Sequence, residues 1–105
     1  MSSGARAQTV ELFIFARFHA REGAEAATEE ALHEVLGPSR AEAGCLSINA
    51  FRSTIDPRLF YVHSHWKNEA AFDLHASLSH TEHFTGRIAP LIDHELEVKR
   101  TTLIG

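Results

Sequence analysis

Hydrophobic and polar positions alternate through residues 9–18, whose sequence is TVELFIFARF. Successive side chains of a strand point to opposite faces, so the aliphatic residues and Phe18 share one face while Phe13 and Phe15 occupy the other. Large apolar groups therefore stand on both faces. The pattern predicts a strand that is covered on both sides.

Helical spacing replaces this alternation after Gly23. Residues 24–36 are rich in Ala and Glu, and their apolar side chains recur at three- and four-residue intervals, which is typical of a helix with one buried face. We expect Gly37 and Pro38 to bend or end this helix, because proline lacks the amide hydrogen that a helix interior uses. Gly44 can close any helical turn that remains.

Two further alternating stretches, residues 45–52 and 59–66, predict strands. Asp56 and Pro57 stand between them and favour a turn, so we expect the two strands to form a hairpin. The second stretch, LFYVHSHW, ends in the only tryptophan of the chain.

A second helical segment follows Asn68, a residue type that caps helix N-termini with its side chain. We expect a break near residues 77–79, after which helical spacing resumes as far as residues 90–93. Residues 95–103 then predict a fourth strand. The residues on the buried side of the helical segment are predicted to include Ala71, Phe72, His75, Leu78, His80, Phe84 and either Arg87 or Ile88.

The predicted order of elements is β-α-β-β-α-β, the pattern of α+β proteins with a ferredoxin-like fold. Right-handed crossovers place both helices on the same face of one antiparallel sheet, which leaves the other face open. Phe13, Phe15 and Tyr61 belong to that face, and a monomer would expose them to water. We therefore expect a homodimer in which two copies pack through their open sheet faces about a two-fold axis.

Composition and charge limit the number of domains, the kinds of partner and the cellular location that we expect. The chain has 105 residues, 44% hydrophobic and 23% charged, so we expect one folded domain over residues 9–105 behind a flexible N-terminus of residues 1–8. The formal net charge of −4 disfavours nucleic acid and anionic membranes as partners. The single cysteine, Cys45, cannot form an internal disulfide, and no apolar run is long enough for a membrane span. We expect a cytoplasmic protein.

The number of histidines is unusual, with eight copies among 105 residues. His75 and His80 follow the apolar spacing of the second helical segment, so both imidazoles should point toward the sheet. Each is either a core histidine paired with a backbone carbonyl or part of a pocket wall, and two on one wall favour the pocket. A neutral imidazole in apolar surroundings can accept a phenolic proton near neutral pH, which makes both candidate bases.

Other candidate site residues allow two interpretations each. Trp66 is either one wall of a pocket for a flat ligand or a core aromatic residue. Asn49 and Arg87 can donate hydrogen bonds to a ligand oxygen, although a solvated surface is the commoner place for an arginine. His63 and His65 have a spacing that can hold a metal ion, but no third ligand is evident, so we expect them to be polar members of the open face.

Four segments of the chain resemble the antibiotic biosynthesis monooxygenase family of dimeric α/β barrels. They are PSRAEAGCL (38–46), FYVHSHWKNEAAFDLH (60–75), HTEHF (80–84) and IAPLID (88–93), and the resemblance covers nearly the whole chain. It implies a ferredoxin-like homodimer with a pocket in each chain between the sheet and the helices.

The resemblance also implies a chemistry. Similar family members oxygenate phenols or quinols without a flavin, haem or metal, because the deprotonated substrate itself supplies electrons to O2. The roles that the resemblance implies are a base at His75 or His80, a clamp on the aromatic ring by Trp66 and Phe84, and stabilisation of the oxyanion by Arg87 or Asn49.

Two function classes therefore stand side by side: a cofactor-independent monooxygenase acting on a small aromatic quinol or phenol, and a non-catalytic dimeric module that binds a small molecule. Haem breakdown is disfavoured, because Ala16 and Ile88 stand where similar haem-degrading proteins carry asparagine and histidine.

Overall fold

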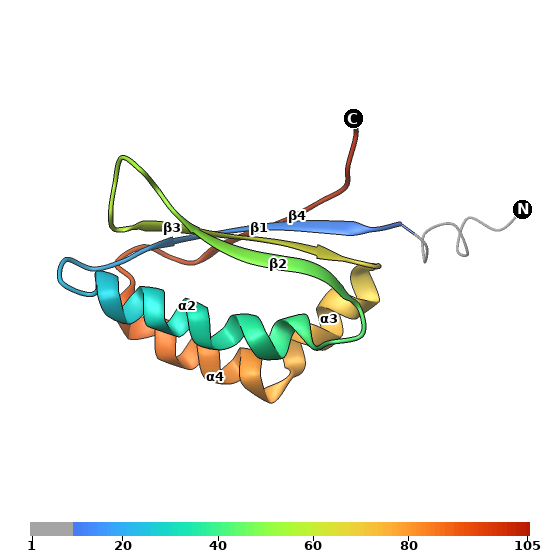
Figure 1. Cartoon of the computed structure of the whole chain (residues 1–105), viewed down its shortest axis with the longest axis horizontal. Helices are drawn as coiled ribbons and strands as arrows, with labels where there is room; N and C mark the ends of the chain where they lie inside the picture. Colours follow the sequence, from blue (N-terminus) through green and yellow to red (C-terminus); the bar gives the residue numbers. More distant parts are fainter. Residues whose placement is uncertain (1–9) are drawn as a thin grey trace, which may run out of the picture.

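The computed structural model describes residues 10–105, in which one antiparallel sheet carries helices on a single face (Figure 1). The predicted flexible segment of residues 1–8 lies outside the described residues, as does Thr9. The elements in chain order are β1 (Leu12–His19), α2 (Glu25–Arg40), β2 (Cys45–Arg52), β3 (Leu59–Trp66), α3 (Glu69–Ser77), α4 (Ser79–Ile88), the 3-10 helix η1 (Ala89–Leu91) and β4 (Glu97–Thr101). No helix within residues 10–105 is both long and apolar enough to cross a membrane.

This order confirms the predicted α+β class and ferredoxin-like topology, with the second helical segment divided into α3 and α4. The strands β2 and β3 have the predicted bounds, and the helix breaks at Leu78, inside the predicted interval. Asn68 caps α3 as predicted, since its Oδ1 accepts a hydrogen bond of 2.9 Å from the backbone N–H of Ala71. β1 begins later than expected, at Leu12, and β4 is shorter than expected at both ends.

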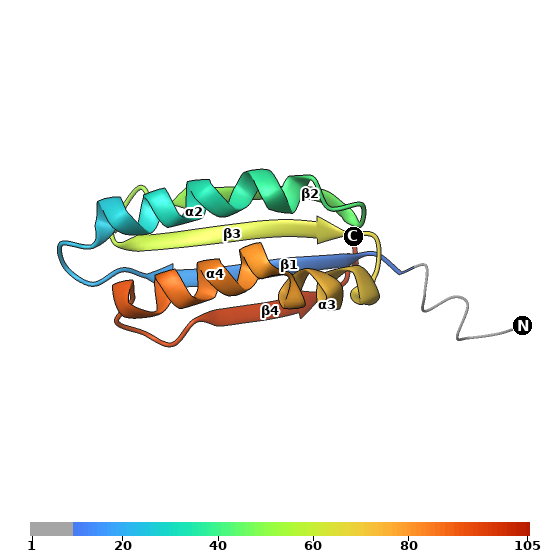
Figure 2. The same cartoon turned by 90° about the horizontal axis from the view of Figure 1, so that it is seen from below.

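The sheet has the strand order β2-β3-β1-β4, and every neighbouring pair is antiparallel. Figure 2 shows the helices lying across this sheet, with α2 over β2 and β3 and with α3 and α4 over β1 and β4. Residues directly opposite one another in the register share a face, so the helix-covered face of β1 continues through Val62 and Ser64 of β3.

Of the two outcomes expected at Gly37 and Pro38, a bend or an end of the first helix, the end is wrong, because α2 continues to Arg40 with Pro38 inside it. Proline removes one amide donor from the helix interior, but the following Ser39 and the preceding Leu36 are buried against the rest of the protein. Burial of this face outweighs the local preference of the Gly-Pro pair.

The loop after α2 passes very close to α3. A Cβ atom built on Gly44 would lie 2.4 Å from the Cβ of Ala71, so only glycine fits at this crossing. The Gly44 carbonyl also accepts a 3.0 Å hydrogen bond from the N–H of Lys67, just before α3. Gly44 therefore fastens the end of α2 to the start of α3, rather than closing a helical turn as predicted.

The core lies between the sheet and the helices. Phe60, Leu32 and Ile88 are almost fully buried in its larger part. A smaller cluster forms around Trp66, which has no exposed surface and packs with Leu12 and Ile14. Trp66 thus lies on the helix-covered side of the sheet, with Leu12 opposite it in the register of β1 and β3.

The opposite side of the sheet carries the predicted aromatic surface. The Phe13 ring stacks on His65 with ring centroids 4.1 Å apart, and Phe15 packs against His63 at 4.8 Å. Phe15 is 51% exposed. We call this surface the open face; its aromatic and imidazole members are Phe13, Phe15, Phe51, Tyr61, His63 and His65.

The contact at Gly44 gives a first prediction. Gly44→Ala should lower the free energy of unfolding by about 1–3 kcal/mol, because the added methyl group meets Ala71 and forces the loop and α3 apart. Urea unfolding followed by circular dichroism measures this. The matched control is Gly86→Ala in α4, where a Cβ meets nothing within 4 Å and helix propensity should add about 0.5–1 kcal/mol. Equal effects of the two substitutions would contradict the prediction.

Candidate active site

A cavity of about 280 Å³ lies between the sheet and the helices. Every strand and every α-helix contributes to its wall, and most of the wall is apolar. The side chains that bring polar atoms to it are Ser39, Ser64, His75, Thr81 and Thr85. An apolar chamber with a few polar groups is typical of a site for a small organic molecule.

His75 is the imidazole on this wall. It lies on α3, is 8% exposed, and its ring packs against the indole of Trp66 with centroids 4.5 Å apart. Its Nδ1 donates a 2.7 Å hydrogen bond to Oε2 of Glu42 and lies 3.3 Å from the hydroxyl oxygen of Thr81. The position of α3 is set by the Asn68 cap and the Gly44 contact, so these features also position His75.

Glu42 connects the two candidate bases. The same Oε2 atom accepts a second hydrogen bond, of 2.6 Å, from Nε2 of His80 in the first turn of α4. The Glu42 side chain is only 11% exposed, and it comes from the loop between α2 and β2. His80 does not line the cavity itself; it reaches His75 through this shared carboxylate.

The shared carboxylate defines which nitrogen of His75 can act as a base. A carboxylate can only accept, so Nδ1 of His75 carries a proton. In the neutral ring the lone pair is then on Nε2, which makes no hydrogen bond with any described residue. An imidazole held in this way by a carboxylate is suited to take a proton from a ligand in the cavity.

The two predicted aromatic clamps occupy different places. Phe84 of α4 lines the cavity and meets Phe18 edge to face at 5.8 Å between centroids. Trp66 lies behind His75 rather than on the cavity wall, and its Nε1 donates a 2.9 Å hydrogen bond to the hydroxyl of Ser64. Trp66 therefore supports the wall on which His75 and Ser64 stand.

The structure does not bring the two predicted oxyanion donors to the cavity. Arg87 turns outward and pairs with Glu34 and Glu30 of α2, which raise the pKa of its guanidinium. Its neighbour Ile88 takes the inward position. Asn49 lies opposite His63 on the open face, because strand alternation turns it away from the buried Ile48, and its side chain accepts a hydrogen bond from Arg40.

Cys45 lies close to the carboxylate but is not an activated nucleophile. Burial raises the pKa of its thiol, and the negative charge of Glu42 raises it further. The thiol therefore remains protonated at neutral pH.

Two groups in residues 10–105 have the donor types and spacing of a metal site: Glu42 with His75 and His80, and His19 with Asp93 and His94. In each group the donor atoms lie within 4.8 Å of one another. Two imidazoles and one carboxylate suit a divalent transition metal. His63 and His65 belong to neither group, and on the open face the ring of His65 stacks on Phe13 while that of His63 packs against Phe15.

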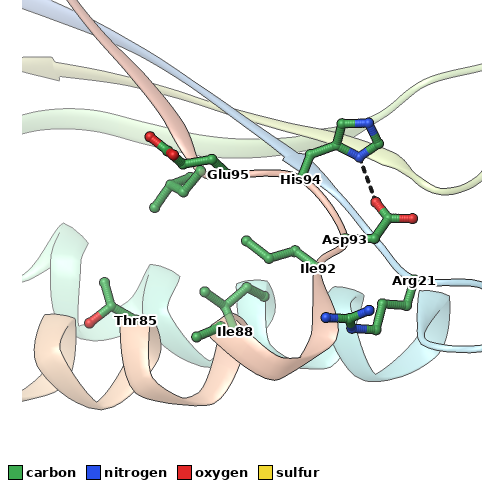
Figure 3. A pocket seen from close by; sticks show the side chains of 9 residues that line it. Arg21, Thr85, Ile88, Ile92, Asp93, His94 and Glu95 are labelled. Atoms are coloured by element: carbon green, nitrogen blue, oxygen red, sulfur yellow. Dashed lines mark hydrogen bonds and ion pairs between the residues drawn. The ribbon is translucent and has the colours of Figure 1, made fainter.

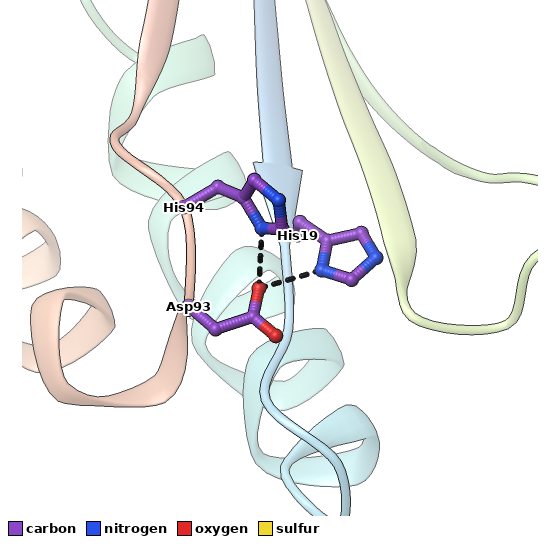
Figure 4. Close-up of side chains that lie close together, drawn as sticks. All are labelled: His19, Asp93 and His94. Carbon is purple, nitrogen blue, oxygen red and sulfur yellow. Dashed lines mark hydrogen bonds and ion pairs between the residues drawn. The ribbon is translucent and has the colours of Figure 1, made fainter.

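The second group lies beside a shallow, open hollow of about 420 Å³ at the start of the segment that leads into β4 (Figure 3). Figure 4 shows His19, from the end of β1, and His94 both directed at Asp93. Each Nδ1 donates to Oδ1 of Asp93 at 2.6 Å, while Arg58 binds the other carboxylate oxygen. These contacts fasten β1, the hairpin loop and the β4 segment to one carboxylate.

Sequence comparison places the chain among known proteins. The family model described as antibiotic biosynthesis monooxygenase matches residues 12–87. No curated protein gives a match.

Solved structures share the fold over nearly their whole length. PA3566 from Pseudomonas aeruginosa is 28% identical, with a TM-score of 0.86 over 93% of this chain and 98% of its own. Rv0793 from Mycobacterium tuberculosis is 23% identical, with a TM-score of 0.86 over 90% of this chain and 96% of its own. A structure named antibiotic biosynthesis monooxygenase is 21% identical, with a TM-score of 0.85 over 90% of this chain and 99% of that one.

The carboxylate of Asp93 gives a prediction on pH. Hydrogen bonds from His19 and His94 hold its pKa far below the usual value, so its contribution to stability is present above about pH 4 and is lost as the pH falls toward the lowered pKa. Asp93→Asn should lower the unfolding midpoint at pH 6, and the difference from the wild type should shrink between pH 4 and pH 2. Thermal unfolding at several pH values measures it. A difference that stays constant over this range would contradict the role of the charge.

Proposed function

Because the chain belongs to the antibiotic biosynthesis monooxygenase family, we propose that it oxidises a small aromatic quinol or phenol with O2 and needs no flavin, haem or metal. The observation that carries this proposal is His75, which stands on the wall of an apolar cavity with one nitrogen bound to Glu42 and the other unpaired among the described residues. Such a cavity suits a flat aromatic ring, and such an imidazole suits removal of its phenolic proton.

The reaction balances without a cofactor. His75 Nε2 takes the phenolic proton, and the electron-rich phenolate passes one electron to O2, which gives a phenoxyl radical and superoxide. Their recombination at a ring carbon forms a carbon–oxygen bond, and the imidazolium of His75 returns its proton to the peroxide. The ring-bound hydroperoxide then loses water to leave a quinone, and His75 is neutral again. One oxygen atom enters the product and the other leaves in water, while the substrate supplies all the electrons. The protein contributes a base, orientation and a chamber that excludes bulk water.

Each residue of the cluster has a separate part in this proposal. His75 is the catalytic base, and Phe84 contacts the ring of the substrate. Glu42 is a positioning residue, because it holds the proton of His75 on Nδ1 and stabilises the imidazolium after proton transfer. His80 supports Glu42 from the other side, and Trp66 supports the ring of His75.

We also propose that the protein is a homodimer formed through the open face. Phe15, Phe51 and Tyr61 are 51%, 53% and 40% exposed and lie on one surface, where a second copy would remove them from water. The cytoplasm is the proposed location, because the single cysteine, Cys45, is a free thiol and cannot form an internal disulfide.

The test of the base is oxygen uptake by untagged, EDTA-treated protein with anthrols, naphthoquinols and catechols, corrected for autoxidation. His75→Ala should lower kcat by about 100-fold or more, because the general base is lost. Glu42→Gln should lower kcat less and leave KM nearly unchanged, since it disturbs only the orientation and charge of His75. His83→Ala is the matched control, because His83 lies on the outer side of α4 with its side chain 71% exposed.

Three outcomes would contradict the proposal in different ways. Uptake that disappears with EDTA and returns with a divalent metal would show that Glu42, His75 and His80 hold a metal ion. Saturable binding of the same compounds without oxygen uptake would identify a non-catalytic binding module. Unchanged uptake in His75→Ala with a loss in His80→Ala would assign the base to His80.

The proposed dimer is tested by mass in solution. Phe15→Glu should convert a dimer into a monomer, because it places a charge in the centre of the apolar contact. Sedimentation velocity at micromolar concentrations measures this. Leu74→Glu is the control, because Leu74 is 60% exposed but lies on α3, away from the open face. A wild-type protein that sediments as a monomer, or a Phe15→Glu variant that remains dimeric, would refute this interface.

A further inference from the structure

One hydroxyl group on the cavity wall has no partner. Ser39, in the last turn of α2, has no exposed surface, and its Oγ makes no hydrogen bond within the part of the chain that the structure describes. Buried polar groups in proteins are usually paired, and leaving one unpaired costs stability. A helical serine commonly bonds the carbonyl four residues earlier, but Ser39 does not do so here.

The other hydroxyl groups of the wall are already engaged. Ser64 accepts the indole N–H of Trp66, Thr81 lies within hydrogen-bond distance of Nδ1 of His75, and Thr85 donates to the carbonyl of Glu82. Ser39 is thus the one hydroxyl on the described wall that has no hydrogen-bond partner. Since a hydroxyl both donates and accepts, it can pair with either a carbonyl or a hydroxyl oxygen.

Water alone fits this position poorly. An ordered buried water needs two to four polar partners, whereas most of the surface around this cavity is carbon. The volume of about 280 Å³ is also many times the roughly 30 Å³ that one water molecule occupies in the liquid. A ligand that fills the chamber with an apolar ring and places one oxygen at Ser39 satisfies both the hydroxyl and the carbon surface.

We infer that Ser39 is a substrate-binding residue whose hydroxyl group binds a second oxygen of the ligand, so that the site selects aromatic rings carrying two oxygens over those carrying one. This inference rests on the proposed function for the other oxygen, which is the one that His75 deprotonates. It narrows the substrate class to dihydroxylated or keto-hydroxylated aromatic compounds.

The test is anaerobic binding, which does not depend on turnover. The probes are 1,4-dihydroxynaphthalene and 1-naphthol, which share a ring system and differ by one hydroxyl group. Calorimetry and quenching of Trp66, the only tryptophan, report the dissociation constants. The wild type should bind the dihydroxy compound roughly two- to twelvefold more tightly, the range that one net hydrogen bond supplies. Ser39→Ala should abolish this preference and leave the affinity for 1-naphthol within a factor of two.

The chain offers a matched control on the same helix. Thr28 of α2 is also fully buried with an unpartnered hydroxyl, but it does not line the cavity. Thr28→Val should therefore leave both dissociation constants unchanged. Neither substitution removes a hydrogen bond within the described chain, so urea unfolding should show both variants at least as stable as the wild type.

The outcomes separate this inference from the proposed function. A preference for the dihydroxy compound that survives in Ser39→Ala, or an equal loss of affinity for both probes, would overturn the role of Ser39 and leave the proposed oxidation untouched. Tight, Ser39-dependent binding without any oxygen uptake in air would support the binding role and refute the oxidation. Failure of both probes to bind the wild type would overturn both.

Discussion

Packing of all the helices against one face of the sheet is the constraint on which the rest of the structure depends. Because strand side chains alternate, this packing divides β1 and β3 into residues that face the helices and residues that face outward. The inward set fills the core around Phe60 and Trp66, and where the filling is incomplete it leaves the cavity. The outward set gathers the aromatic rings of the open face.

The proposed chemistry depends on segments that are far apart in the chain. Glu42 follows α2, His75 lies in the last turn of α3 and His80 in the first turn of α4, yet one carboxylate oxygen contacts both imidazoles. The close crossing of Gly44 and Ala71 holds the loop of Glu42 against the helix of His75. The same contact therefore bears on both stability and the proposed function. Gly44 lets the loop approach α3, and this approach brings Glu42 within hydrogen-bond distance of His75.

The fold could be predicted from the sequence because most helices and strands are marked by the residue types and spacing within their own segments. The alternation in β2 and β3 set their bounds, and the Asn68 cap and the break at Leu78 were visible as residue types. The length of α2 could not be predicted in this way. Burial of Leu36 and Ser39 stabilises the helix more than the Gly-Pro pair destabilises it. That balance depends on tertiary contacts that no short window of sequence contains.

The candidate site was less accessible to sequence reasoning. Helical spacing predicted that His75 faces the sheet, but Glu42 lies in a loop with no periodicity, and its contact with His75 depends on the path of the chain through Gly44. Strand alternation alone could have placed Asn49 on the open face beside His63, since Ile48 faces the core. The choice between Arg87 and Ile88 was open from spacing, and the carboxylates of Glu30 and Glu34 decide it.

The central strand β1 has a consequence for how the two faces communicate. Ile14, Ala16 and Phe18 line the cavity, while Phe13 and Phe15, which alternate with them along the strand, lie on the open face. Hydrogen bonds to β3 and β4 hold this strand on both edges, so its two faces share one firmly held backbone. Any shift of this backbone caused by a contact on the open face would therefore also move the wall of the cavity.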